Sequence, residues 1–201
     1  MVRLTRRAAL LAAGVLPFLP RRAQAQTPIG SVAEVTGEAT LVHDDAPAPM
    51  SAGMALAEGD TALTGENALA LLILETDTRV NMGAATTVVL SRYLADVGGE
   101  IQVGGAIVFD RPEGLAPVDL TFDTGFGQIG VRGTRFFVGP SRGEYAVFCD
   151  RGRVVVTNAG VTRELGPGDG VNLTADGPPS EVAQWGAPRV QEAFESVGLT
   201  P

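Results

Sequence analysis

Short apolar runs separated by turn residues fill this chain from Gly30 to Thr174, and they constrain the fold more than any other feature. Glycine, aspartate or asparagine interrupts the runs, and this stretch shows almost no helical periodicity. Runs of this kind with turn signals every ~8–12 residues are typical of a sandwich, a barrel or a solenoid. The sequence therefore predicts an all-β domain over residues 26–175. The expected strands are VAEVT, ATLV, ALALLIL, TTVVL, EIQV, AIVF, VDLTF, EYAVFC, RVVVTN and VTREL.

Two kinds of internal similarity favour one of these architectures. A glycine precedes the runs in GEATLV, GEIQV, GAIVF and GRVVV, and the turn LAEGD at 56–60 returns as LGPGD at 165–169. A chain that coils, with a turn glycine before each short strand, would produce this pattern. We therefore expect a compact β-solenoid or β-roll, with a β-sandwich or jelly roll as the alternative.

The parity of apolar residues predicts which strands are buried. Ala68–Leu74 is apolar at both parities, so we expect both of its faces to be covered. The segments 78–82 and 161–165 alternate between apolar and polar residues, so each should keep one face in water.

The segment 43–60 contains two prolines and is expected to be the longest irregular loop. It begins with His43, Asp44 and Asp45, and these three side chains together could bind a cation. Three adjacent residues of one extended segment cannot all point inward, so a solvated loop is the better interpretation. The loop ends in a glycine turn in which Asp60 should bond to nearby backbone.

The first 25 residues have the pattern of an export signal. Basic residues precede an apolar run at 8–19, and Ala23 and Ala25 form the small-x-small site of a signal peptidase. The run is shorter than the ~20 residues of a spanning helix. Arg6-Arg7 resembles a twin-arginine signal, with the general secretory route as the alternative. We expect residues 1–25 to be removed, leaving a soluble periplasmic protein without a transmembrane segment.

The charge balance excludes polyanionic partners. The basic residues are all arginine, and after loss of residues 1–25, which hold 5 of the 15 arginines and no acid, 10 arginines face 23 acids, a net charge of −13. A chain this acidic is repelled by nucleic-acid phosphates and by anionic membrane surfaces. We therefore expect no nucleic-acid partner.

Catalytic motifs are missing from the sequence. The chain holds one cysteine, Cys149, and one histidine, His43, and it has no zinc-protease, serine-hydrolase, Walker or paired-cysteine pattern. Cys149 shares its parity with Tyr145 and Val147, which predicts a buried, inert thiol. We expect no enzyme activity, no cofactor and no metal. A hydrolase that uses scattered carboxylates is the alternative, although one Trp and two Tyr supply few platforms for sugars.

The tail, residues 176–201, differs from the β-domain. It is rich in turn residues, and PRVQEAFESVG predicts a helix over 188–197 that begins at a proline and ends at a glycine. Trp185 should hold this tail against the β-domain.

The stretch GQIGVRGTRFFVG at 127–139 could be a ligand-binding loop or a strand. A phosphate-binding loop leads into a helix, whereas TRFFVG is a strong strand former. Ile129 and Val131 have one parity, and Phe136 and Val138 have the other. A β-bulge at Gly133-Thr134 would let both pairs face the same core. The bulge could also turn Arg132 or Arg135 inward, where the buried guanidinium would need an acidic partner. The candidate acids are Asp119, Asp123 and Asp150.

This stretch resembles the signature of the FecR domain, the V-x-G-T-x-F-x-V pattern of bacterial periplasmic proteins. Further blocks follow the family's order over residues 30–173, among them GEATLV, GGAIVF, VFCDRGRVVVTN and LGPGDGVNL. The resemblance implies an all-β, solenoid-like periplasmic domain for sensing and signal relay. In the family's namesake this domain connects an outer-membrane ferric-siderophore receptor to an anti-sigma segment across the inner membrane. The motif residues, which the resemblance implies are structural, are Val131, Gly133, Thr134, Phe136 and Val138.

The namesake's anti-sigma region and spanning helix have no counterpart in this sequence, so we expect a stand-alone form. Its expected function is that of a non-catalytic binding or adaptor module whose partner is a protein or an envelope glycan. The alternatives are the carboxylate-dependent hydrolase and a structural envelope protein that self-associates through exposed sheet edges. The sequence indicates neither an oligomeric state nor a role for iron.

Overall fold

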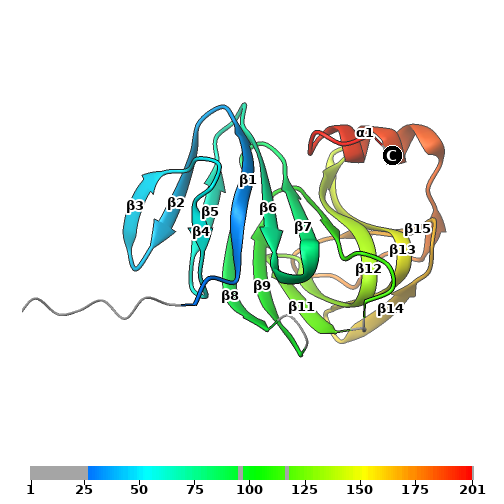
Figure 1. The fold of residues 1–201 in the computed structure, drawn as a ribbon. Coiled ribbons are helices and arrows are strands. Elements are labelled where there is room, and N and C mark those ends of the chain that lie inside the picture. The colour runs from blue at the N-terminus through cyan, green and yellow to red at the C-terminus, as the bar shows by residue number, and fades with distance from the viewer. Residues whose placement is uncertain (1–26, 95–96, 116–117, 201) are drawn as a thin grey trace, which may run out of the picture.

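Short strands build almost the whole fold of the computed structural model, which describes residues 27–94, 97–115 and 118–200 (Figure 1). The prediction of an all-β domain is confirmed, and the finer prediction of a solenoid stays a prediction. The expected export signal, with Ala23 and Ala25, lies outside the described residues. The elements are β1 (Gly30–Thr36), β2 (Ala39–His43), β3 (Ala46–Pro49), β4 (Ala55–Leu56), β5 (Thr61–Thr64), β6 (Leu69–Leu74), η1 (Glu75–Asp77), β7 (Thr78–Met82), β8 (Thr87–Leu94), β9 (Gly98–Gly104), β10 (Ile107–Asp110), β11 (Asp119–Thr124), β12 (Gly127–Ser141), β13 (Glu144–Asn158), β14 (Val161–Leu165), β15 (Asp169–Leu173), β16 (Ala183–Gln184) and α1 (Ala187–Glu195).

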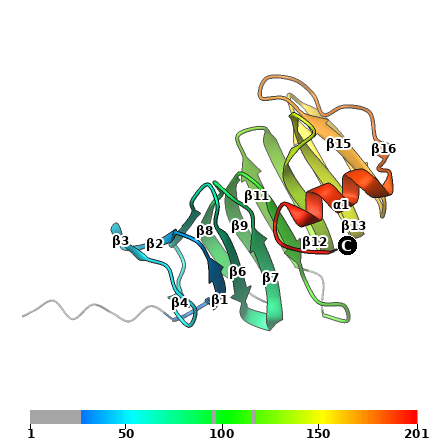
Figure 2. The ribbon, with the colours of Figure 1, turned by 90° about the horizontal axis from the view of Figure 1, so that it is seen from above.

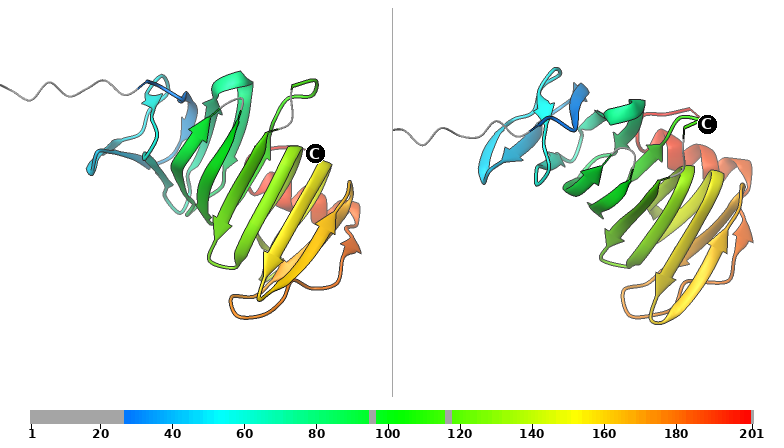
Figure 3. Two further views of the ribbon diagram at one scale, coloured as in Figure 1. Left: turned by 90° about the horizontal axis from the view of Figure 1, so that it is seen from below. Right: turned by 60° about the horizontal axis from the view of Figure 1, so that its bottom comes forward.

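The strands form one 16-stranded sheet that divides at β12. β12 and β13 are the longest strands and pair antiparallel almost from end to end. The other side of β12 is shared, because its first part pairs with β11 and its later part with β10. The first arm runs β11-β9-β8-β5-β2-β3, and the second arm runs β10-β7-β6-β1-β4. The sheet curls so that both arms contribute to one core (Figures 1, 2 and 3).

The bulge expected in β12 is present and lies where the two arms separate. The register of β12 against β13 shifts around Gly133, which has a φ of +62°. Ile129 and Val131 before the shift and Phe136 and Val138 after it belong to the same core cluster. The bulge therefore lets residues of opposite parity face one interior.

β13 changes parity at the same corner, which the sequence analysis did not anticipate. Cys149 enters the core from one half of the strand and Val154 from the other. Gly152 lies between them with a φ of +86°, and a Cβ added there would lie 2.6 Å from the carbonyl oxygen of Gly133. The two strands therefore bend at the same place, where Gly152 of β13 lies against Gly133 of β12.

Three phenylalanines join the arms in the core. Phe109 of β10, Phe122 of β11 and Phe136 of β12 are fully buried. Their ring centroids lie 5.0 to 5.8 Å apart, and Phe122 meets both of the other rings edge-on. Such edge-to-face pairs add to the stability from burial alone.

The repeated sequences LAEGD and LGPGD form the same turn. The carboxylate of Asp60 accepts a hydrogen bond from the backbone N–H of Ala57 at 2.8 Å, and Asp169 accepts one from Gly166 at 2.9 Å. The glycine before each aspartate has a positive φ, +91° and +88°. The sequence repeat thus has a local cause, the hydrogen bonding of one type of turn.

The prediction of a long irregular loop over residues 43–60 is wrong. This segment holds β3 and β4, and β2 and β3 form a hairpin whose turn is Asp44-Asp45, both with positive φ. Pro47 and Pro49 lie in β3, the last strand of its arm, where a missing N–H does not interrupt the sheet.

Candidate functional site

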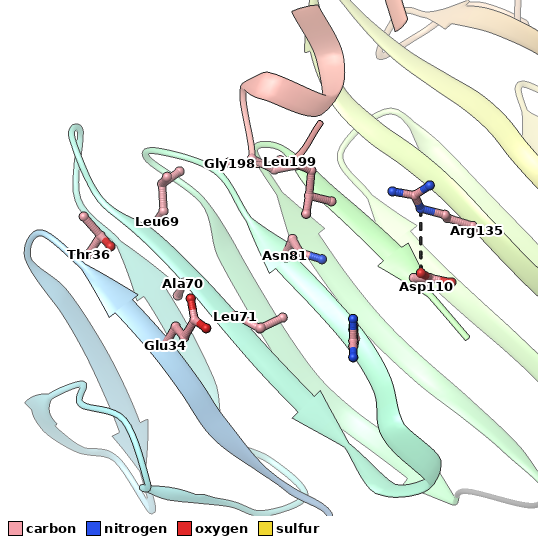
Figure 4. Close-up of a pocket in the computed structure, with 12 residues that line it drawn as sticks. Glu34, Thr36, Leu69, Ala70, Leu71, Asn81, Asp110, Arg135, Gly198 and Leu199 are labelled. Atoms are coloured by element: carbon pink, nitrogen blue, oxygen red, sulfur yellow. Dashed lines mark ion pairs between the residues drawn. The ribbon is translucent and has the colours of Figure 1, made fainter. Parts of the chain in front are cut away.

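A groove of about 430 Å³ lies on the outer face of the second arm, beside the end of α1 (Figure 4). It joins segments far apart in the sequence, because β1, β6, β7, β10, β12 and the turn after α1 all line it. We call it the outer groove. The lining residues used below are Glu34, Leu71, Arg79, Asn81, Arg135 and Leu199.

The floor of the outer groove includes the apolar outer face of β6. Leu72 and Leu74 point into the core and are fully buried, whereas Leu69 and Leu71 line the groove and are only partly buried. We expected both faces of Ala68–Leu74 to be covered. The structure fully covers only the face that points into the core. Two leucines remain partly open to solvent.

The helix α1 ends beside the groove, and the residues that follow it, Val197, Gly198 and Leu199, form one wall. The helix crosses the outer face of β12 and β13 (Figure 2), where Phe194 packs with Val108, Phe137 and Phe148 in a second apolar cluster. Trp185 stacks on Phe148 at a centroid distance of 5.0 Å, so the expected attachment of the tail through Trp185 is confirmed.

Among the described residues, no helix has both the length and the apolar content to cross a bilayer.

A row of charged residues crosses the sheet at the edge of the groove. Arg135 reaches Asp150 at 3.1 Å and Asp110 at 3.7 Å, and Arg151 reaches Asp110 at 3.0 Å and Glu113 at 3.3 Å. The bulge turns neither arginine into the core, since Arg132 is exposed and Arg135 lies on the outer face; of the candidate acids, Asp150 is the one that pairs with Arg135. Arg135 also lies over the ring of Phe194, with its guanidinium carbon 4.7 Å from the centroid. The row therefore connects the bulge to α1.

Two other polar side chains of the groove, Arg79 and Asn81, are not part of this row of ion pairs. Arg79 is exposed and makes no ion pair within the described part of the chain. Asn81 is 9% exposed, and its amide makes no hydrogen bond to a described residue. Sequence reasoning anticipated a wet face for segment 78–82 but did not single out Asn81, because a polar residue at an outer position usually lies in solvent.

The single cysteine and the single histidine of the chain each contact other groups. Burial, together with the negative charges of Asp150 and Asp169, raises the pKa of the Cys149 thiol to about 11. Its sulfur lies 3.7 Å from each of the carbonyl oxygens of Arg151 and Gly152. His43 instead contacts Asp60, with Nδ1 2.6 Å from the buried carboxylate. Across the described ranges, no group of three His, Cys, Asp or Glu side chains could hold a metal ion.

The family-motif residues lie in the corner of the fold rather than in the groove. Val131, Thr134, Phe136 and Val138 are buried, and Gly133 forms the bulge. A Cβ added at Gly133 would meet no atom within 4 Å. A structural role for these residues, as the resemblance implies, stays a prediction.

Comparison with known proteins gives one family and one fold. The FecR protein family matches residues 60–174. Two crystal structures of a candidate anti-sigma factor from Parabacteroides distasonis are similar, each with a TM-score of 0.54 and 17% identity over 69% of this chain. The match covers 65% and 64% of those chains, so this chain spans slightly less than two thirds of their length. At this identity the likeness is one of fold. The comparison with curated proteins gives no match.

The family match includes the bulge, the charged row and four of the five strands that line the outer groove. Since it extends over more than half of the chain, this protein belongs to the FecR family.

Proposed function

We propose that this protein is an exported FecR-domain binding module that relays a signal by contact with another protein in the periplasm, without catalysis of its own. Membership of the FecR family supports the signalling role. The pattern of residues 1–25 supports export, by the twin-arginine or the general secretory route.

The outer groove is the observation that carries this proposal. It combines partly open leucines with polar groups that no described residue pairs. Apolar surface bordered by a few oriented polar groups is typical of a recognition site for a protein. An envelope glycan would instead need exposed aromatic platforms, and Trp185 packs against Phe148 and Arg189.

The solved neighbours bear on the kind of process. They are candidate anti-sigma factors, and we infer that this chain also acts in regulation by protein contact. The common fold supports this inference but does not supply a partner, because one fold hosts many functions.

Site-specific photo-crosslinking in living cells tests the proposal. A benzophenone amino acid replaces Leu71 in the outer groove, and a matched variant carries it at Val155 of β13, a half-buried aliphatic residue on a different surface, beside β11 and β12. We expect a defined protein adduct from position 71 and none from position 155. Adducts at neither position, or equal adducts at both, would contradict the proposal.

A further inference from the structure

Two polar side chains that pair with no residue in the described ranges lie next to each other on β7, on the same face of the sheet. Arg79 and Asn81 are two positions apart, so their side chains leave the strand ~7 Å from each other. Asn81 is nine-tenths buried and is directed into the outer groove (Figure 4), where its amide meets no hydrogen-bonding group of the described chain.

The amide of Asn81, which bonds to none of the residues that the structure describes, points to a ligand. An asparagine side chain has two N–H donors and one carbonyl acceptor, and a buried amide is normally paired. Its strand neighbours across the sheet, Leu71 and Val108, are apolar. A partner that brings both a C=O and an N–H, as a peptide group does, would satisfy this amide.

Arg79 forms no ion pair with a described acid, although one lies opposite. Asp110 faces it across the β7–β10 pair, but the carboxylate of Asp110 is within 3.7 Å of Arg135 and 3.0 Å of Arg151. The guanidinium of Arg79 therefore remains available to an outside carboxylate, with which it can form two parallel hydrogen bonds.

The apolar side of the groove lies next to these two groups. Leu71 pairs with Asn81 across β6 and β7, and Leu69 and Leu199 line the same groove. The other charges of the lining are Glu34, Asp110 and Arg135, so a highly charged anion such as a phosphate would meet two carboxylates. A single carboxylate beside an apolar side chain fits better.

We propose that the outer groove binds an extended peptide segment of a partner protein, in which an apolar residue stands beside an aspartate or glutamate. The carboxylate pairs with Arg79, the backbone of the segment pairs with Asn81, and the apolar side chain packs on Leu69 and Leu71. The ~7 Å between Arg79 and Asn81 matches the two-residue repeat of an extended chain. This inference rests on the proposed function and specifies the chemistry of the partner.

Titration of the 15N-labelled protein with synthetic peptides tests the inference by nuclear magnetic resonance. The probe is acetyl-GSLDLSG-amide, and the comparison peptides replace its aspartate by asparagine or lysine, or both leucines by serine. We expect saturable shifts of the amides around Arg79, Asn81 and Leu199. The asparagine and serine peptides should bind about tenfold more weakly, because a charge-assisted pair or the apolar contact is lost.

Charge reversal provides the matched control. Arg79→Glu should abolish binding of the aspartate peptide and allow binding of the lysine peptide. Arg132→Glu should behave like the wild type, because Arg132 is also exposed without an ion pair to a described residue but lies at a different surface. Equal binding of the aspartate and asparagine peptides, no effect of Arg79→Glu, or no shifts in the groove at about 5 mM peptide would overturn the inference.

The crosslinking result separates this inference from the proposed function. If Leu71 captures a protein whose adduct survives Arg79→Glu unchanged, the binding module stands and the peptide chemistry is wrong. If the peptides bind as expected but cells yield no adduct, the groove chemistry stands and the relay function is wrong. Self-association would appear as an adduct between two copies of this chain, and it would contradict the partner assigned here.

Discussion

Arg135 reaches from β12 to Asp150 on β13, with its Nη1 3.1 Å from the Oδ2 of Asp150, directly beside the bulge that separates the two arms. The same guanidinium lies 3.7 Å from Asp110 and 4.7 Å from the centroid of Phe194. One side chain thus connects the corner of the sheet to α1 and to the wall of the outer groove.

Arg135→Gln should lower the free energy of unfolding by about 2 kcal/mol, because it leaves the partly buried carboxylate of Asp150 without its cation and Asp110 with Arg151 alone. Arg142→Gln is the control, since the Arg142–Glu192 pair is exposed and should contribute little. Urea denaturation of both variants gives the comparison. Equal losses would show that Arg135 acts as an ordinary surface residue.

The two corner glycines should differ in their tolerance of alanine. Both need a positive φ, but only Gly152 lacks room for a Cβ, which would lie 2.6 Å from the carbonyl oxygen of Gly133. Gly133→Ala should cost about 1 kcal/mol and Gly152→Ala about 3 kcal/mol or more. Chemical denaturation measures both, and a costlier Gly133→Ala would refute the packing at this corner.

The His43–Asp60 contact should make stability depend on pH. The hydrogen bond and the charge of Asp60 raise the pKa of His43 above its usual 6.5, and Asp44 adds to this. A raised pKa means that the stabilisation is fully present below about pH 6.5 and is lost as the pH rises through the higher, folded-state pKa.

Melting temperatures of wild type and His43→Gln from pH 5 to 9 test this dependence. The wild type should exceed the variant most at low pH, and the difference should shrink as the pH rises. The matched turn provides a control, because the second oxygen of Asp169 bonds to the neutral amide of Gln184. Gln184→Ala should shift the melting temperature equally across this range, and a difference that grows with pH for His43→Gln would contradict the assignment.

Cys149 should resist thiol reagents in the folded protein. Burial raises the pKa of its thiol to about 11, so at pH 8 almost none is present as the reactive thiolate. Labelling with a disulfide reagent should be slow in buffer and rapid in denaturant. Equally rapid labelling under both conditions would show that the thiol is accessible.

Local patterns in the sequence predict much of this fold but not its groove. The parity break between Val131 and Phe136 indicates the bulge, because a strand can reverse its buried face only by adding a residue. The same break in β13, between Cys149 and Val154, is equally visible in the sequence, since Gly152 marks it. The all-β class follows from the spacing of turns.

The outer groove depends on long-range arrangement, which a single sequence does not show. It forms only because β1, β6, β7, β10, β12 and the turn after α1 meet on one face. Ala68–Leu74 is apolar at both parities, which predicts that both of its faces are covered. Within the described residues the turn after α1 lines the groove over its outer face, and Leu71 stays partly exposed.

One variant, Asn81→Leu, tests most directly whether the outer groove is a recognition site. If Asn81 serves a partner, its replacement removes no hydrogen bond to a described residue and adds apolar contact on the sheet, so the melting temperature should stay the same or rise. Crosslinking from position 71 should at the same time fall by about tenfold. A lower melting temperature with unchanged crosslinking would show that Asn81 supports the fold, and it would contradict the account.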